Sequence, residues 1–152
     1  MEEGIKAEPA FTDCCKEILG LKEKEPGMYS PLVLAYLGDG VYELIIRSKV
    51  VNMGNMQVNK MHKKSASLVK AQTQAAMIRF LEPELSEEEK TVVRRGRNAK
   101  SATMAKNATM ADYRLATGFE ALVGYLYLSG QFERLIVLVG RGLEKIEESG
   151  TG

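Results

Sequence analysis

Residues that build disulfide frameworks and zinc sites are scarce in this sequence. Its 152 residues include two cysteines, one histidine and no tryptophan. The cysteines, Cys14 and Cys15, are adjacent, and such neighbours rarely pair because the linkage is strained. They provide neither a disulfide framework nor a four-ligand zinc site, and we assign them no role. His62 excludes any mechanism that needs two histidines, and we interpret it as a structural or surface residue.

The sequence also lacks long apolar runs. No run reaches the roughly 20 residues that a membrane-spanning helix needs. The first residues, MEEGIKAEPAF, are acidic and contain no apolar segment of the kind found in a signal peptide. Together with the low cysteine content, these absences predict a soluble protein of a reducing compartment, the cytoplasm, with no membrane partner.

No charge of either sign dominates, since 21 Lys and Arg residues against 20 Asp and Glu give a net charge of +1. As an average, this balance argues against a nucleic-acid-binding protein, which usually carries a basic excess. The average conceals segregation, because the net charge is −3 over residues 1–59, +6 over 60–106 and −2 over 107–152. The basic middle segment makes nucleic acid a candidate partner again.

The basic charge is densest over residues 94–106, RRGRNAKSATMAK, which contain five cations and no acid. Their Gly, Asn, Ser and Thr content predicts a loop that exposes backbone N–H and hydroxyl donors, and such a loop suits a phosphate backbone. Few aromatics lie among the cations, which favours a duplex over a stacked single strand. The alternative is an ordinary solvated surface run. Lys60, Lys63 and Lys64 would extend the patch.

Helical periodicity dominates the chain, and its composition, 45% hydrophobic and 27% charged, is that of a packed domain. Helix starts are marked by a Ser-Pro pair at Ser30 and by capping patterns at Ser86 and Thr109. The predicted helices cover about 9–19, 31–50, 58–81, 86–96, 109–129 and 132–146. The sequence thus predicts an all-α fold and a single domain over residues 1–152, with a core of about 8–148 and short tails.

Two carboxylates stand within segments that are otherwise apolar enough to be buried. Asp39 lies in LAYLGDGVYELII and Glu120 in TGFEALVGYLYL, and glycines occur close to both. A buried carboxylate needs a cation, a hydrogen-bond network or a metal. If the two helices cross, Asp39 and Glu120 converge as hard oxygen ligands for Mg²⁺, which can activate water against a phosphodiester. The alternatives are carboxylates at the helix rim or ion pairs with Arg47 or Arg114.

Two strings carry a family resemblance. Residues 34–44, LAYLGDGVYEL, resemble the signature of the ribonuclease III catalytic domain, and residues 119–124, FEALVG, resemble its second acidic motif. The chain length, the RRGRNAKS segment and residues 113–120, YRLATGFE, are more narrowly similar to the Mini-ribonuclease III branch. The resemblance covers nearly all of residues 26–147.

The resemblance implies a homodimeric, Mg²⁺-dependent endonuclease with the ribonuclease III helical fold. It implies double-stranded RNA as substrate, in particular the 23S ribosomal RNA precursor, and Mn²⁺ as a substitute metal. The catalytic and metal-binding acids of the two motifs fall on Asp39 and Glu120. Longer relatives carry two more carboxylates, at the positions of Ala35 and Thr117 here, so a four-carboxylate cage is not expected. They also append a double-stranded-RNA-binding domain, for which this chain is too short.

On this interpretation, Asp39 and Glu120 hold the ion for a hydrolysis that leaves 5′-phosphate and 3′-hydroxyl ends. Glu43, one turn after Asp39, is a candidate outer-shell residue, and an i,i+4 salt bridge with Arg47 is an equally good interpretation. A dimer would supply the two centres that cutting both strands of a duplex requires. Contacts to phosphates are predicted for Lys63, Lys64, Arg94, Arg95, Arg97, Asn98 and Lys100.

Two other functions stay open. A non-catalytic RNA-binding or ribosome-assembly module would bind RNA in a salt-sensitive way and form no metal-dependent product. A helical nucleotide pyrophosphohydrolase would need ExxE repeats, which the consecutive Glu87, Glu88 and Glu89 do not form. The sequence leaves open the dimer interface, the number of ions and the need for an accessory ribosomal protein.

Overall fold

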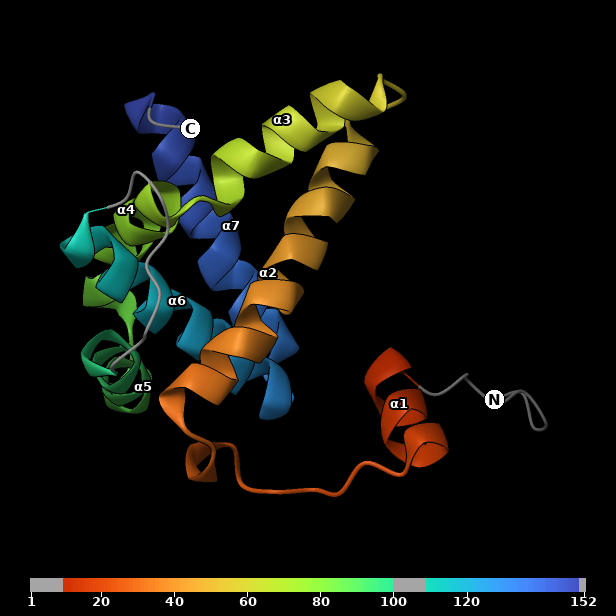
Figure 1. Cartoon of the computed structure of the whole chain (residues 1–152), viewed down its shortest axis with the longest axis vertical. Helices are drawn as coiled ribbons and strands as arrows, with labels where there is room; N and C mark the ends of the chain where they lie inside the picture. Colours follow the sequence, from red (N-terminus) through yellow and green to blue (C-terminus); the bar gives the residue numbers. More distant parts are fainter. Residues whose placement is uncertain (1–9, 100–108, 151–152) are drawn as a thin grey trace, which may run out of the picture.

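The structure is a computed structural model that describes residues 10–99 and 109–150. These residues form helices and no strand, which confirms the predicted all-α class. In Figure 1, α6 lies at the centre of the helical body, where it contacts α2, α4, α5 and α7, while α1 stands apart. The helices are α1 (Phe11–Leu19), α2 (Pro31–Asn52), α3 (Val58–Val69), α4 (Ala71–Leu81), α5 (Glu87–Asn98), α6 (Met110–Leu128) and α7 (Phe132–Ser149), with 3₁₀ turns η1 (Pro26–Met28) and η2 (Glu82–Glu84).

Side-chain caps fix the starts of three helices where the sequence predicts them. The Ser30 hydroxyl accepts a hydrogen bond from the backbone N–H of the third residue of α2, and the Thr109 hydroxyl does the same for α6. At α5, Ser86 and Glu89 form a reciprocal capping box. Each cap satisfies N–H groups that have no partner within the helix, so these boundaries follow from local sequence.

The single helix predicted over residues 58–81 is wrong, because the chain breaks at Lys70 into α3 and α4. Lys70 has an extended backbone, with φ −69° and ψ 155°. The last carbonyls of α3 lose their helical partners at this break, and three buried side chains satisfy them instead. The Thr73 hydroxyl donates to the Ser67 carbonyl at 2.6 Å, the Tyr42 hydroxyl to the Leu68 carbonyl at 2.7 Å and the Gln74 amide nitrogen to the Val69 carbonyl at 2.9 Å.

The crossing of α2 and α6 depends on two glycines. A Cβ added to Gly38 of α2 would overlap the main-chain carbonyl of Glu120, and one added to Gly124 of α6 would overlap the carbonyl of Leu34. The two backbones therefore approach more closely than any side chain would allow. This contact fixes the position of α2 along α6 at the level of both acidic motifs.

A second pair of glycines joins α5 to α6. A Cβ at Gly96 would lie 2.9 Å from the Cα of Gly118, and one at Gly118 would lie 2.7 Å from the Val93 carbonyl. The helix α5 therefore continues to Asn98, beyond the end predicted near Gly96. The predicted loop at 94–106 is wrong for residues 94–98, because these residues are helical. Gly96 packs against Gly118 of α6 and does not end the helix.

An ion pair ties the first turn of α5 to α7. Arg134 donates from Nε to Glu89 Oε2 at 2.9 Å and from Nη2 to Oε1 at 2.8 Å. Glu89 is only 4% exposed. The hydrogen bond from Arg134 outweighs the effect of burial and holds the pKa of Glu89 below its usual value. Both ends of α5 are thus attached to the body, one by charge and the other by glycine contact.

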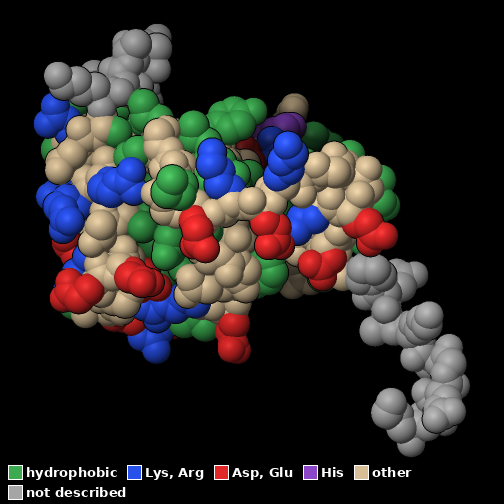
Figure 2. Space-filling model, turned by 90° about the horizontal axis from the view of Figure 1, so that it is seen from below, with side chains coloured by type: hydrophobic (Ala, Val, Ile, Leu, Met, Phe, Trp, Pro, Cys, Tyr) green, Lys and Arg blue, Asp and Glu red, His purple; other side chains and the backbone are tan. Residues whose placement is uncertain are grey.

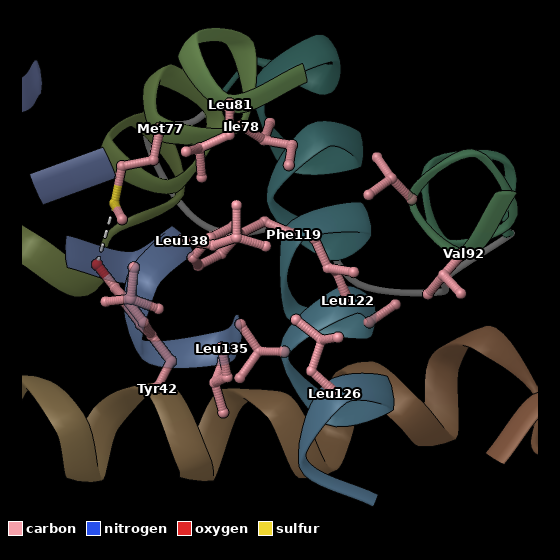
Figure 3. Close-up of a cluster of buried hydrophobic side chains, with 14 of the residues drawn as sticks. Tyr42, Met77, Ile78, Leu81, Val92, Phe119, Leu122, Leu126, Leu135 and Leu138 are labelled. Carbon is pink, nitrogen blue, oxygen red and sulfur yellow. Dashed lines mark hydrogen bonds between the residues drawn. The ribbon is translucent and has the colours of Figure 1, made fainter. Parts of the chain in front are cut away.

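The core lies between α2, α4, α6 and α7 and is organised around Tyr42 and Phe119 (Figure 3). Their rings meet edge to face with centroids 5.1 Å apart, an arrangement that aromatic pairs prefer. Burial is the main cause that raises the pKa of the Tyr42 phenol, and the nearby Glu120 adds to it. The Tyr42 hydroxyl is therefore neutral at ordinary pH and remains a hydrogen-bond donor to the end of α3.

The helix α1 contributes nothing to this core, since none of its residues is buried. Phe11 and Ile18, on the same face of α1, are 72% and 80% exposed. Among all the helices of the described residues, α1 included, none is long and apolar enough to cross a membrane.

We expect Gly38→Ala to lower the free energy of unfolding by at least about 3 kcal/mol, because the new methyl group meets rigid backbone. Gly140→Ala is the matched control, since a Cβ at this α7 position meets no atom within 4 Å. It should gain about 0.5–1 kcal/mol from helix propensity. Urea unfolding followed by circular dichroism measures both, and equal stability of the two variants would contradict the close crossing.

Candidate active site

Asp39 and Glu120 converge in one cavity of about 390 Å³. Asp39 comes from α2 and is exposed at the cavity, whereas Glu120 comes from α6 and is partly buried. The glycine crossing explains their proximity, because Gly38 precedes Asp39 and packs on the carbonyl of Glu120. The sequence prediction that the two carboxylates converge is therefore met by the geometry. The lining also includes residues of the α3–α4 break, namely Val69, Lys70, Ala71, Gln72 and Gln74.

The surroundings of Glu120 favour the protonated form of its carboxyl group. Burial is the first cause, and a hydrogen bond with Asp39 and repulsion by the Asp39 charge add to it, so that the pKa of Glu120 rises to about 8. A hydrogen bond from the Gln74 amide acts in the opposite direction. Neither carboxylate has an ion pair within the described residues, so the predicted alternatives with Arg47 and Arg114 are not found.

The two positions at which longer relatives were expected to carry acids also face this cavity. Ala35 and Thr117 both line it and are 6% and 7% exposed. The Thr117 hydroxyl donates to the Tyr113 carbonyl in its own helix, at 3.0 Å. In the described part of the chain, no group of three or more His, Cys, Asp or Glu side chains could hold a metal. The acidic donors of this cavity are therefore Asp39 and Glu120.

This donor set fits Mg²⁺. The ion prefers hard oxygen ligands, and sites with one or two carboxylates and several waters are common. Burial is the main cause of the raised Glu120 pKa, and a cation between Asp39 and Glu120 would relieve the repulsion that adds to it. The cavity has room for such a hydrated ion beside a phosphate group.

Two residues highlighted in the sequence lie outside the cavity lining. Glu43 pairs with Arg47 one turn later, with 3.5 Å between Glu43 Oε1 and Arg47 Nη2. This contact is the salt bridge given as the alternative to an outer-shell role. His62 is exposed on α3 and borders a different, smaller hollow beside Arg47.

Sequence reasoning missed Gln74, which is 1% exposed and reaches Glu120 from α4. Its amide nitrogen lies 3.4 Å from Glu120 Oε2. The available signal was an amide at a position that the helical pattern marks as buried. Lys70 was missed because the helical spacing continues across it and conceals the break.

The predicted phosphate contacts fall on two separate helices. Arg94, Arg95, Arg97 and Asn98 are exposed on the second half of α5, and Lys63 and Lys64 are exposed on α3. In Figure 1, α3 and α5 are separate helices, with α3 at the top of the view and α5 at the lower left. The prediction that the α3 lysines extend the basic patch of residues 94–106 stays a prediction, because part of that patch lies outside the described residues. Figure 2 shows Lys and Arg side chains gathered on the side where α5 lies, with acids beside them. Lys100 lies outside the described residues.

Comparison with known proteins places this geometry in a family. The ribonuclease III domain matches residues 32–131. The chain is 53% identical over 119 residues to the Mini-ribonuclease 3 of Thermoanaerobacter sp. (strain X514), covering 78% of this chain and 84% of that protein. It is 47% identical over 124 residues to the Mini-ribonuclease 3 of Brevibacillus brevis, covering 82% and 92%. A Fusobacterium nucleatum protein of known crystal structure is similar with a TM-score of 0.73 at 29% identity, over 81% of this chain and 98% of that one.

The chain belongs to the ribonuclease III family, which makes it an endoribonuclease by class. Within that family it is similar to the Mini-ribonuclease 3 proteins over most of its length. The resemblance that the two acidic motifs indicate is therefore confirmed, and both motifs lie inside the matched residues.

The raised pKa of Glu120 predicts how stability depends on pH. Between about pH 4.5 and 8 the folded chain keeps a proton on Glu120 that the unfolded chain releases near 4.5. The free energy of unfolding therefore falls as pH rises through this window. We expect Glu120→Gln, which cannot ionise, to gain stability relative to wild type from pH 5 to pH 8 in EDTA.

Glu144→Gln, at an exposed position of α7, is the control for this experiment. Urea unfolding at several pH values gives the comparison. A constant stability difference between Glu120→Gln and wild type across the window would show that Glu120 titrates normally.

Proposed function

We propose that this chain is an Mg²⁺-dependent endoribonuclease that cleaves double-stranded RNA, with the 23S ribosomal RNA precursor as its substrate in the cytoplasm. The observation that carries the proposal is the convergence of Asp39 and Glu120 in a cavity of a ribonuclease III fold. Similarity to Mini-ribonuclease 3 proteins supports the substrate class. Mn²⁺ is expected to substitute for Mg²⁺, because it accepts the same oxygen ligands.

Asp39 and Glu120 would hold the ion directly or through its waters. The chemistry that Mg²⁺ supplies at such a site is activation of water and neutralisation of phosphodiester charge, which leaves 5′-phosphate and 3′-hydroxyl ends. The chain's own contribution is placement. The rigid α2–α6 crossing fixes the two carboxylates relative to each other, and Glu120 is partly buried at the cavity wall. Ionisation of Glu120 is required before it can act as a ligand.

We propose that the exposed cations of α5 contact the RNA phosphates, together with Lys100 and with Lys63 and Lys64 of α3. Cations at these positions release counterions from a phosphate backbone and carry no base specificity. These side chains, Arg94, Arg95, Arg97 and Asn98, lie within about the last one and a half turns of α5, so they can contact one stretch of duplex backbone.

A homodimer is proposed through the outward side of α2. This side carries an apolar outer stripe of residues spaced at helical intervals opposite the buried face of α2. The outer stripe consists of Val33, Leu37, Gly40, Leu44 and Val51. Val33, Leu44 and Val51 are 48%, 62% and 63% exposed. Apolar surface of this extent favours a partner, and a two-fold dimer gives one cavity for each RNA strand.

The alternative is a non-catalytic RNA-binding or ribosome-assembly module. The paired carboxylates favour the enzyme, because a binding module has no use for two repelling acids in a partly buried cavity. An accessory ribosomal protein that presents the RNA is compatible with either function.

We expect Asp39→Asn and Glu120→Gln to lower cleavage of a long RNA duplex by at least about 100-fold, because each removes a proposed ligand. Binding of the duplex in EDTA should change by less than about twofold, since phosphate contacts lie elsewhere. Gel analysis of products with Mg²⁺ or EDTA and mobility shifts measure the two quantities. Glu144→Gln should match wild type in both.

Full activity of Asp39→Asn and Glu120→Gln would refute the two-carboxylate mechanism. Absence of Mg²⁺-dependent fragments from the wild-type chain would favour the binding module.

We expect Leu44→Glu to shift the dimer toward monomer by at least about tenfold in Kd, because it places an unpaired charge in the outer stripe. Ile18→Glu on α1 is the matched control, since Ile18 is 80% exposed and α1 has no buried residue. Sedimentation equilibrium measures both. A wild-type monomer, or equal weakening by the two variants, would exclude the outer stripe as the interface.

A further inference from the structure

Gln74 differs from the two other side chains that satisfy the end of α3. Thr73 and Tyr42 each donate to one α3 carbonyl, and their hydrogen bonds do not go to Glu120. The Gln74 amide nitrogen instead serves two acceptors, the Val69 carbonyl at 2.9 Å and Glu120 Oε2 at 3.4 Å. It therefore links the break between α3 and α4 to the active-site acid.

The amide oxygen of Gln74 has no hydrogen-bond partner among the described residues, although it is fully buried. A buried acceptor without a donor opposes folding. A methionine would fill the same space without this cost. The amide nitrogen compensates for this cost in part by capping the Val69 carbonyl, and it also reaches Glu120, which capping of Val69 does not require.

The geometry gives the nitrogen a fixed position. The extended backbone at Lys70 releases the Val69 carbonyl from helical bonding, and this main-chain oxygen holds the amide nitrogen at the shorter of its two contacts. The backbone N–H of Gln74 is itself bonded to the Lys70 carbonyl at 3.1 Å. Both the main chain and the side chain of Gln74 are thus hydrogen-bonded at the break. The amide nitrogen is held there when it contacts Glu120.

We propose that Gln74 is a positioning residue, whose anchored amide nitrogen orients the Glu120 carboxylate toward Asp39 for cation binding. This inference rests on the proposed function, because it concerns the same cavity. Gln74 itself does not touch the substrate in this arrangement. It acts as an outer-shell donor to a ligand, and such donors commonly set metal affinity.

Two variants separate this role from simple capping of α3. Gln74→Met removes the bonds to both Val69 and Glu120. Thr73→Val removes the neighbouring cap, on Ser67, and leaves Glu120 untouched. Gln74→Asn serves as a second probe if the methionine variant does not fold, because its amide is one methylene too short to reach both acceptors.

Calorimetry measures Mn²⁺ binding to the chain without RNA. The Glu120→Gln variant identifies which ions bind at this cavity. The Tm in EDTA shows whether each variant is folded. We expect Gln74→Met and Gln74→Asn to weaken Mn²⁺ binding about tenfold. Thr73→Val should stay within about twofold of wild type, even though its Tm falls.

Wild-type affinity in both Gln74 variants would overturn the positioning role while leaving the proposed function intact. Equal loss of affinity in Thr73→Val would also overturn it, because any loosening of the α3 end would then suffice. A wild-type chain that binds no Mn²⁺ at Glu120 would overturn the proposed function and this inference together.

Discussion

The close crossing of α2 and α6 is the constraint on which the rest of the molecule depends. Gly38 and Gly124 let the two backbones touch, and no other residue type fits at either point. The same contact buries Tyr42 against Phe119 and brings Asp39 to Glu120. Core and cavity are therefore two products of one helix contact, and a change that separates the helices affects both.

The break at Lys70 is the second determinant, and it is coupled to the first through side chains. Tyr42 of α2 donates to the end of α3, while Gln74 of α4 contacts Glu120 of α6. Buried hydrogen bonds of this kind are costly to leave incomplete, so they specify one arrangement of the four helices. The α3–α4 break thus belongs to the cavity wall as much as to the fold.

Local patterns in the sequence were sufficient for the helix starts at Ser86 and Thr109, because a cap involves residues only three apart. The convergence of Asp39 and Glu120 was also predictable, since glycines beside acids in apolar helices indicate close packing. The break at Lys70 was not, because its cause is a set of contacts from distant residues. The helix end predicted near Gly96 is wrong for the same reason, because Gly96 packs against Gly118, which is distant in the sequence.

Rigid attachment of α5 has a consequence for the proposed cleavage. Its first turn is held by Arg134, and Gly96 sits on Gly118, two residues before Glu120. No hinge separates the exposed arginines of α5 from the acid in the cavity. Helix packing would then set the distance along the duplex between the phosphates that α5 contacts and the phosphodiester bond that is cleaved.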